Sequence, residues 1–382
     1  MPWTQTDAMC ERAKFIFTFK EGVYSMTELC ERYGISRKTG YKWLSRYEAG
    51  GLEGLREQSR APRSIPHRTL KETEDALVEL RKKRPSWGAR KLLTRLKRTR
   101  PELTLPAPST VTALLHRHDL VKPRRRQRKP QHPGSKPLEA AAPNDVWTID
   151  FKGEFLLGNK RYCYPLTVCD ARTRFLLSCT GLPSTKGVPA MEVIERLFYE
   201  HGLPRAIRTD NGSPFATQAI GGLSRLNIYW LKLGIRHDRI DPSSPQQNGR
   251  HERMHRTLKA ETTRPPETTF EAQQHRFDAF RYVFNQERPH EALGMDTPAD
   301  HYQSSTRNMP GALPQPEYLG HMEVRRVGSN GSFRFKGHVL FLSETLSGEH
   351  IALDEIDNGI WSIYFANLLL GRLNERTFTI TP

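Results

Sequence analysis

The chain of 382 residues is 36% hydrophobic and 9% aromatic and carries a formal net charge of +17, which predicts two to four domains and a polyanionic partner. No apolar run approaches the roughly 18 residues of a membrane span, the first residues lack a signal-peptide layout, and the five cysteines include no CxxC pair. These features exclude the membrane and secreted classes and predict a cytoplasmic protein with reduced thiols.

Positive charge is concentrated in the first third of the chain. Residues 1–130 contain 30 Lys and Arg against 14 Asp and Glu, whereas the remaining residues contain 29 against 28. We therefore expect the first third to bind nucleic acid. An unspecific basic tail is the alternative, but this region is rich in helix patterns and is not of low complexity.

Residues 8–55 are helical in pattern and predict a DNA-binding domain over 1–60. Thr27 is expected to cap a short helix that ends at Tyr33, Gly34 to supply a tight turn, and Ser36 to cap the next helix. The apolar residues expected to join the two helices are Ile35, Tyr41 and Leu44, and the basic residues expected on the outer face are Arg37, Lys38 and Lys42. This layout is typical of a helix-turn-helix; a plain pair of packed helices is the alternative.

Residues 61–121 predict a second helical, winged-helix-like DNA-binding domain. Helices are expected over 74–84, after Ser86-Trp87-Gly88, and from Pro108-Ser109. The basic residues expected to contact DNA on the middle helix are Arg90 and Lys91. The stretch 122–143 is a basic, Pro-rich linker, which either tracks phosphates or is a solubilising hinge. Its candidate phosphate contacts are Arg124, Arg125 and Arg126.

From residue 144 the pattern changes to short apolar runs alternating with helices. Strands are expected at 146–151, 162–170, 174–180, 206–209 and 235–240, and helices at 186–200, 217–233, 248–261 and 270–284. This order predicts a central α/β domain over 144–309 whose first three strands form a meander and whose later strands enter by crossovers. Turn signals between alternating runs in 312–382 predict a small C-terminal β-barrel, so the chain is a multidomain α+β protein.

Three carboxylates in the central domain carry the predicted chemistry. Asp150 ends the first strand, Asp210 follows the fourth, and Glu252 lies one turn into a helix. Adjacent strand ends lie about 5 Å apart, and three clustered carboxylates repel one another unless a divalent cation lies between them. Oxygen ligands suit Mg²⁺ or Mn²⁺, and two such ions can catalyse phosphodiester chemistry.

At this point the sequence resembles a known family. The matching segments are WTIDF at 147–151, RTDNGSPF at 208–215, SPQQNGRHER at 244–253, LK at 258–259 and RPHEALG at 288–294. They resemble the insertion-sequence transposases with an integrase core (DDE transposases), relatives of retroviral integrases in the ribonuclease-H-like superfamily. Together these motifs are specific, although each alone is weak.

The resemblance implies a catalytic triad of Asp150, Asp210 and Glu252. It also implies that Lys259, a basic residue on the same helix face as Glu252, contacts DNA phosphate. It implies binding to the terminal inverted repeats of a mobile element, cleavage at its ends and joining of the 3′-hydroxyls to target DNA by a multimer, in a nucleoid-associated protein. The chain departs from the family in the longer spacing between Asp210 and Glu252, which an insertion in the surface segment near 219–230 explains.

Three other functions compete for the same residues. His251-Glu252-Arg253-Met254-His255 matches the zinc-protease motif HExxH, but no role for Asp150 and Asp210 follows from it; His251 and His255 are instead expected to be solvated or to face DNA. A transcription regulator with an inactive core has no reason to keep all three acids. A recombinase with a covalent intermediate needs a nucleophile among arginines, and Tyr282 is better explained by helix packing near the core.

Two further aspartates lie beside turn signals. Asp170 precedes Ala171-Arg172-Thr173, and Asp241 precedes Pro242-Ser243-Ser244. Aspartate is a common turn former because its carboxylate accepts nearby backbone N–H groups. We therefore expect both to be structural and not catalytic.

Overall fold

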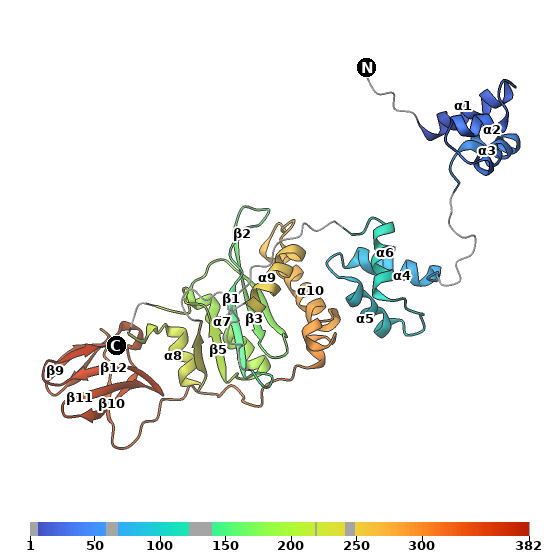
Figure 1. Cartoon of the computed structure of the whole chain (residues 1–382). Helices are drawn as coiled ribbons and strands as arrows, with labels where there is room; N and C mark the ends of the chain where they lie inside the picture. The colour runs from blue at the N-terminus through green and yellow to red at the C-terminus, as the bar shows by residue number, and fades with distance from the viewer. Residues whose placement is uncertain (1–6, 59–67, 122–139, 218–219, 241–248, 382) are drawn as a thin grey trace. The chain divides into compact units, whose positions relative to one another are not determined.

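The computed structural model describes residues 7–58, 68–121, 140–217, 220–240 and 249–381. The chain forms two compact units, 1–68 and 69–382, and Figure 1 displays their elements. Within the described ranges, no helix combines the length and the apolar character that crossing a bilayer requires.

The first unit is a bundle of three helices and a 3₁₀ turn. Its elements are α1 (Ala8–Lys20), α2 (Met26–Arg32), α3 (Arg37–Gly50) and η1 (Gly51–Leu55). Gly34 has φ 64° and turns the chain between α2 and α3, and Ser36 caps α3, both as predicted. The helices approach closely because Gly40 has no side chain: a Cβ there would lie 2.7 Å from the Cys30 sulfur.

Two local predictions in this unit are wrong. Ser25, not Thr27, caps α2, in a reciprocal capping box with Glu28. Tyr41 is 56% exposed, and Trp43 instead is buried in the core of the unit. In each case the sequence offered two similar residues close together. The residue at which α2 begins decided the cap, and the phase of α3 decided which aromatic side chain is buried.

The second unit begins with three helices, α4 (Lys71–Lys83), α5 (Ala89–Thr99) and α6 (Pro108–Arg117). They share a core that includes Trp87, Leu92 and Leu114. Ion pairs connect these helices to the end of the central domain: Arg84 lies 2.8 Å from Glu287 and Arg98 lies 2.7 Å from Asp296.

The central sheet has the spatial order β4-β3-β1-β5-β6, with the short strand β2 on β3. The strands are β1 (Val146–Phe151), β2 (Phe155–Leu156), β3 (Tyr162–Asp170), β4 (Leu176–Leu182), β5 (Ala206–Thr209) and β6 (Arg236–Arg239). β1, β3 and β4 pair antiparallel, and β5 and β6 join in parallel. The predicted meander followed by crossovers is confirmed, and only β2 was missed.

Helices cover both faces of this sheet (Figure 1). α7 (Gly187–His201) and α8 (Arg225–Lys232) pack on the face that carries Trp147 and Ile149. α9 (Gly249–Thr262) and α10 (Phe270–Tyr282) pack on the opposite face. Short helical turns follow α10: η4 (Val283–Glu287), η5 (Glu291–Leu293) and η6 (Pro298–Asp300); η2 (Ile220–Gly222) precedes α8.

The C-terminal part is antiparallel, but it is not the predicted barrel. Its strands are β7 (Glu323–Arg326), β8 (Ser332–Phe335), β9 (His338–Phe341), β10 (His350–Asp357), β11 (Ile360–Phe365), β12 (Leu368–Asn374) and β13 (Thr379–Thr381), with η7 (Glu344–Leu346). They form a five-stranded sheet, β13-β12-β11-β10-β7, and a separate hairpin, β8-β9. A closed barrel would require the edge strand β13 to pair with a second strand. Alternating sequence patterns predict strands but not which edge strands pair. Leu223 and Ile228, from the central domain, complete the core of this sheet.

Candidate functional site

Two of the predicted acids lie on neighbouring parallel strands. Thr148 of β1 pairs with Arg208 of β5, and Asp150 and Asp210 each lie two residues further along. Side chains two residues apart on a strand share a face, and neighbouring strands lie about 4.8 Å apart. Asp210 is exposed, and its carboxylate accepts the N–H of Gly212 at 3.1 Å. The continuation of the β1–β5 register therefore brings the two aspartates to the same level of the sheet.

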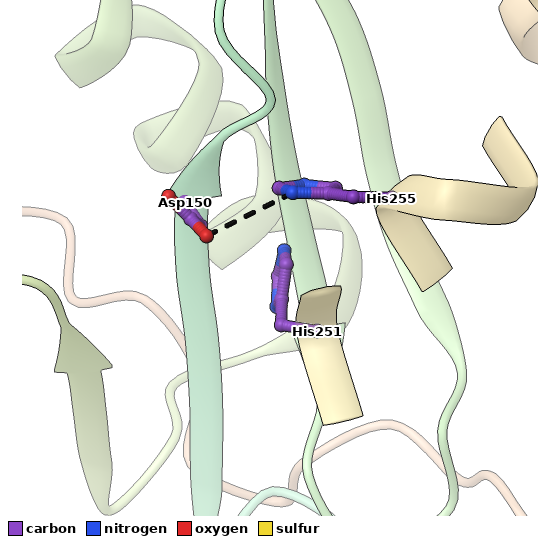
Figure 2. Close-up of side chains that lie close together, drawn as sticks. All are labelled: Asp150, His251 and His255. Atoms are coloured by element: carbon purple, nitrogen blue, oxygen red, sulfur yellow. Dashed lines mark ion pairs between the residues drawn. The ribbon is translucent and has the colours of Figure 1, made fainter. Parts of the chain in front are cut away.

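Helix α9 is fixed over β1 and β3 by two buried histidines. The ring nitrogens of His251 lie 2.9 Å from the Thr148 hydroxyl and 2.6 Å from the Thr167 hydroxyl. His255 Nε2 lies 2.7 Å from the Thr167 hydroxyl, and His255 Nδ1 lies 3.8 Å from the Asp150 carboxylate. Figure 2 shows both imidazoles pointing from α9 toward the strand that carries Asp150. The position of α9 is therefore linked to the backbone of the proposed catalytic strand.

Burial keeps both histidines neutral. It lowers the pKa of His251 to about 3. It also lowers the pKa of His255 to about 2, with smaller contributions from His251 and from the positive charge of Lys152. The expectation that these histidines are solvated or face DNA is wrong, because both are less than 10% exposed. The available signal was the apolar pair Met254 and Leu258, which lies on the buried face of α9 within one helical turn of both histidines.

Asp150, His251 and His255 form a group of three candidate metal ligands, with donor atoms within 4.8 Å of one another. Among the described residues, no other group meets that criterion, and Asp210 and Glu252 belong to none. Imidazole nitrogens suit zinc. However, both nitrogens of His251 already have a threonine hydroxyl as partner, so a metal would have to displace a buried hydrogen bond.

Glu252 and Lys259 are exposed and lie on the side of α9 next to His255. At about 100° per residue, Glu252, His255 and Lys259 fall within a stripe about 60° wide, which we call the acid edge. His255 on this edge contacts Asp150. Glu252 is three residues before His255 and so is its neighbour on the helix surface.

Lys152 is a candidate site residue that the sequence analysis missed. Burial lowers its pKa, the charge of Lys259 lowers it further, and the carboxylate of Asp150 opposes this shift. Lys152 therefore lies within electrostatic range of both. The sequence could have indicated this residue, because Lys152 follows Asp150 by two residues and side chains two residues apart along a strand point to the same face of the sheet.

The remaining predicted residues are distributed as follows. Arg37, Lys38, Lys42 and Arg90 are exposed, and Lys91 is half-buried. Arg124, Arg125 and Arg126 lie outside the described residues, as do Asp241 and most of the motif that precedes α9.

Asp170 is the turn former that was predicted. Its carboxylate accepts the backbone N–H groups of Asn144 and Thr173 and the Thr173 hydroxyl. Tyr282, expected to pack near the core, is instead 62% exposed. Its position gives no support to a buried covalent nucleophile.

Family models match most of the described chain. Two integrase core domain models match residues 140–245 and 233–298. A helix-turn-helix domain model matches 11–63, and a homeodomain-like domain model matches 39–115.

Two curated relatives are proteins of insertion elements. The chain is 30% identical over 272 residues to the uncharacterized 39.2 kDa protein of insertion element IS476 from Xanthomonas euvesicatoria, covering 70% of this chain and 75% of the relative. It is 29% identical to the uncharacterized 31.7 kDa protein of insertion element IS407 from Burkholderia multivorans, covering 59% and 78%. A solved structure of the simian T-cell lymphotropic virus intasome, in complex with a PP2A regulatory subunit, is 16% identical with a TM-score of 0.39, covering 77% of this chain and 97% of that one.

Proposed function

The chain belongs to the insertion-element transposases with a ribonuclease-H-like integrase core and is therefore a metal-dependent DNA transposase; we propose that Asp150, Asp210 and Glu252 hold its catalytic metal. The proposal rests on one observation. Asp150 and Asp210 each follow a paired residue of the parallel strands β1 and β5 by two positions, so they lie at the same level of the sheet. His251 and His255 of α9 contact side chains of β1. This arrangement supports convergence of Glu252 with the two aspartates.

The donor set fits Mg²⁺ or Mn²⁺ better than zinc. The three proposed ligands supply only carboxylate oxygens, which hard divalent cations prefer, and we propose two ions in each site. Bound ions would activate the attacking hydroxyl and stabilise the charge that develops on the leaving oxygen. Lys152 and Lys259 would contact the phosphate beside the acids, while His255 would orient Asp150.

The DNA substrate is proposed to be the terminal inverted repeats of the element. Arg37, Lys38 and Lys42 are exposed near the N-terminus of α3, the helix expected in the major groove. The second helical region and the 122–143 linker would add phosphate contacts through Arg90, Lys91 and Arg124–Arg126.

The proposed reaction has two balanced steps. Water attacks the phosphodiester at each end of the element, forming a P–O bond and breaking the P–O3′ bond, which leaves a 5′-phosphate and frees a 3′-hydroxyl. That hydroxyl attacks a target phosphodiester, forming a new P–O bond and releasing a target 3′-hydroxyl. Because two ends must be joined, the active form is proposed to be a multimer on DNA.

The test is nicking and strand transfer by the full chain on DNA that contains the element ends, with Mg²⁺ or Mn²⁺. Asp150→Asn, Asp210→Asn and Glu252→Gln should each lower both rates by about a hundredfold or more, because each removes a charge that holds the metal. DNA affinity measured without metal should not change.

Glu192→Gln is the matched control, because Glu192 is an exposed glutamate on α7, on the opposite face of the sheet. It should keep wild-type rates. Full activity of Glu252→Gln would show that the third ligand is misassigned, and activity with Zn²⁺ but not with Mg²⁺ would favour the group formed by Asp150, His251 and His255.

A further inference from the structure

A cavity of about 120 Å³ lies on the side of α9 away from the acid edge. Its walls come from α5, β1, the β3–β4 turn, α9 and the segment after α10. Since one water molecule occupies about 30 Å³ of liquid, the cavity has room for a small polyatomic group. Its basic lining residues are Lys91, Arg174, Arg250, Arg253, Arg288 and His290. We call it the cation pocket.

Positive charge in the cation pocket is not balanced by the protein. Arg288 pairs with Glu261 at 3.1 Å. Across the described ranges of the chain, no ion pair within 4 Å involves any of the pocket's other four lysine and arginine side chains. Asp170 is the acidic residue in the lining, and its oxygens accept hydrogen bonds from the turn and from Asn144, so the lysine and arginine side chains of the lining outnumber its acid.

The electrostatics confirm that these charges face one another. Burial and, to a smaller extent, the positive charge of Arg288 lower the pKa of Lys91 to about 8, against smaller opposing effects of Glu291 and Glu261. Burial lowers the pKa of Arg174, as do the charges of Arg250 and Arg253. Repelling cations in a partly buried cavity carry an electrostatic cost that a bound anion would remove.

His290 supplies an independent sign of a missing ligand. Its Nε2 atom is buried and has no hydrogen-bond partner. Burial and, to a smaller extent, the charges of Lys91 and Arg288 lower the pKa of His290 to about 3. Buried polar atoms are nearly always paired, and in the neutral ring this nitrogen is an acceptor. A bound anion would favour protonation of the ring, which turns the nitrogen into a donor to an anionic oxygen.

The cation pocket and the acid edge flank the same helix. Arg250, Arg253 and Thr257 line the pocket and form a second stripe about 60° wide, centred about 160° from the acid edge. We call this stripe the cation edge. His251 also lines the pocket, and it is hydrogen-bonded to the strand that carries Asp150. The wall of the pocket is therefore part of the scaffold of the proposed catalytic site.

We propose that the cation pocket binds a phosphate group, clamped between Lys91 of α5 and the arginines of the central domain. The phosphate comes either from the DNA backbone, which is the source expected if the proposed DNA substrate is correct, or from a free phosphate such as a nucleotide. In the first case the pocket positions DNA across α5 and α9, beside the catalytic acids.

Binding of inorganic phosphate to the full chain, without divalent metal, tests the pocket separately from catalysis. Isothermal titration compares the wild type with Lys91→Gln and Arg174→Asn. Asparagine is chosen because Arg174 has φ 66°, a conformation that asparagine tolerates. Each variant should weaken phosphate binding at least tenfold. The unfolding temperature without phosphate should hold or rise, because a repelling cation has been removed.

The matched controls are Lys160→Asn, an exposed lysine with φ 63°, and Lys97→Gln, an exposed lysine on α5. Both should bind phosphate as the wild type does. Equal phosphate binding by the wild type and both pocket variants would overturn the proposal, even if the acids prove catalytic.

A second arm measures the affinity of the same proteins for DNA carrying the element ends. Parallel losses of phosphate and DNA affinity in the pocket variants identify the DNA backbone as the source. Loss of phosphate affinity with unchanged DNA affinity identifies a free phosphate ligand. Both results support the phosphate site.

Discussion

The acid edge and the cation edge of α9 lie on opposite sides of one helix and have opposite chemical requirements. The acid edge places Glu252 beside the histidine that contacts Asp150, and clustered carboxylates need a cation. The cation edge places Arg250 and Arg253 in a pocket with excess positive charge, which needs an anion. A metal ion on one side and a phosphate on the other would complete both.

His251 lies between the two edges, on the buried side of α9. It lines the cation pocket, and its ring contacts Thr148 and Thr167 below the acid edge. One buried imidazole can therefore hold in place a helix whose two other sides bind different ligands. The predictions below test whether the edges depend on this residue and whether they can be separated.

The largest effect is expected from His251→Ala, which removes one hydrogen-bond partner from each of the Thr148 and Thr167 hydroxyls and opens a cavity. The free energy of unfolding should fall by about 2–4 kcal/mol. Phosphate binding and strand transfer should fall together, because α9 loses one of its two contacts with β1 and keeps only that of His255 with Asp150. Chemical denaturation, phosphate titration and the strand-transfer assay measure the three quantities.

His275→Ala is the control, because His275 is an exposed histidine on the neighbouring helix α10. It should change the unfolding free energy little. If His251→Ala lost strand transfer but kept phosphate binding and stability, only the acid edge would depend on this imidazole, and the proposed link between the two edges would be wrong.

The sequence predicted the acid edge but not the cation edge, for a physical reason. Asp150 and Asp210 end apolar strands, and the position of a strand end follows from local hydrophobic pattern. Arg250 and Arg253 lie within a quoted motif, but their pocket is completed by Lys91 and Arg174, which are distant in sequence. Long-range packing that no local pattern encodes brings these residues together.

The same limit explains the other differences. His251 and His255 lie on the face of α9 that the apolar pair Met254 and Leu258 buries, but a histidine beside such a pair can equally reach solvent, so its own burial depends on long-range packing. The C-terminal strands were predicted from their turns, whereas closure into a barrel depends on how edge strands pair. Strands were predicted correctly where apolar runs were long, as for β3 (Tyr162–Asp170).

A smaller effect, specific to the cation pocket, is expected from pH. The pKa of His290 is about 3 in the folded chain and about 6.5 when unfolded. Between these values the unfolded chain binds the extra proton, so stability falls as pH falls below 6.5. His290 alone should contribute a loss of about 1.4 kcal/mol between pH 7.5 and 5.5.

The measurement compares the pH dependence of unfolding for the wild type and His290→Gln, which should lack this part of the loss. Saturating phosphate should also reduce the loss in the wild type, because a bound anion favours the protonated ring. If the free energy of unfolding depended on pH identically in the two proteins, the protonation of His290 would not contribute to the stability of the chain.

The smallest effect is expected from Lys259→Gln, on the acid edge. Lys259 is exposed and within electrostatic range of Lys152, so it is expected to contact DNA phosphate without base specificity. Its loss should weaken DNA binding a few-fold and reduce the slope of log affinity against log salt by about 1. Phosphate affinity of the cation pocket should not change, because Lys259 lies on the other edge. Lys160→Gln should leave both unchanged. A fall in pocket phosphate affinity on Lys259→Gln would mean that the two edges form one continuous binding surface, and the contrast between them would have to be abandoned.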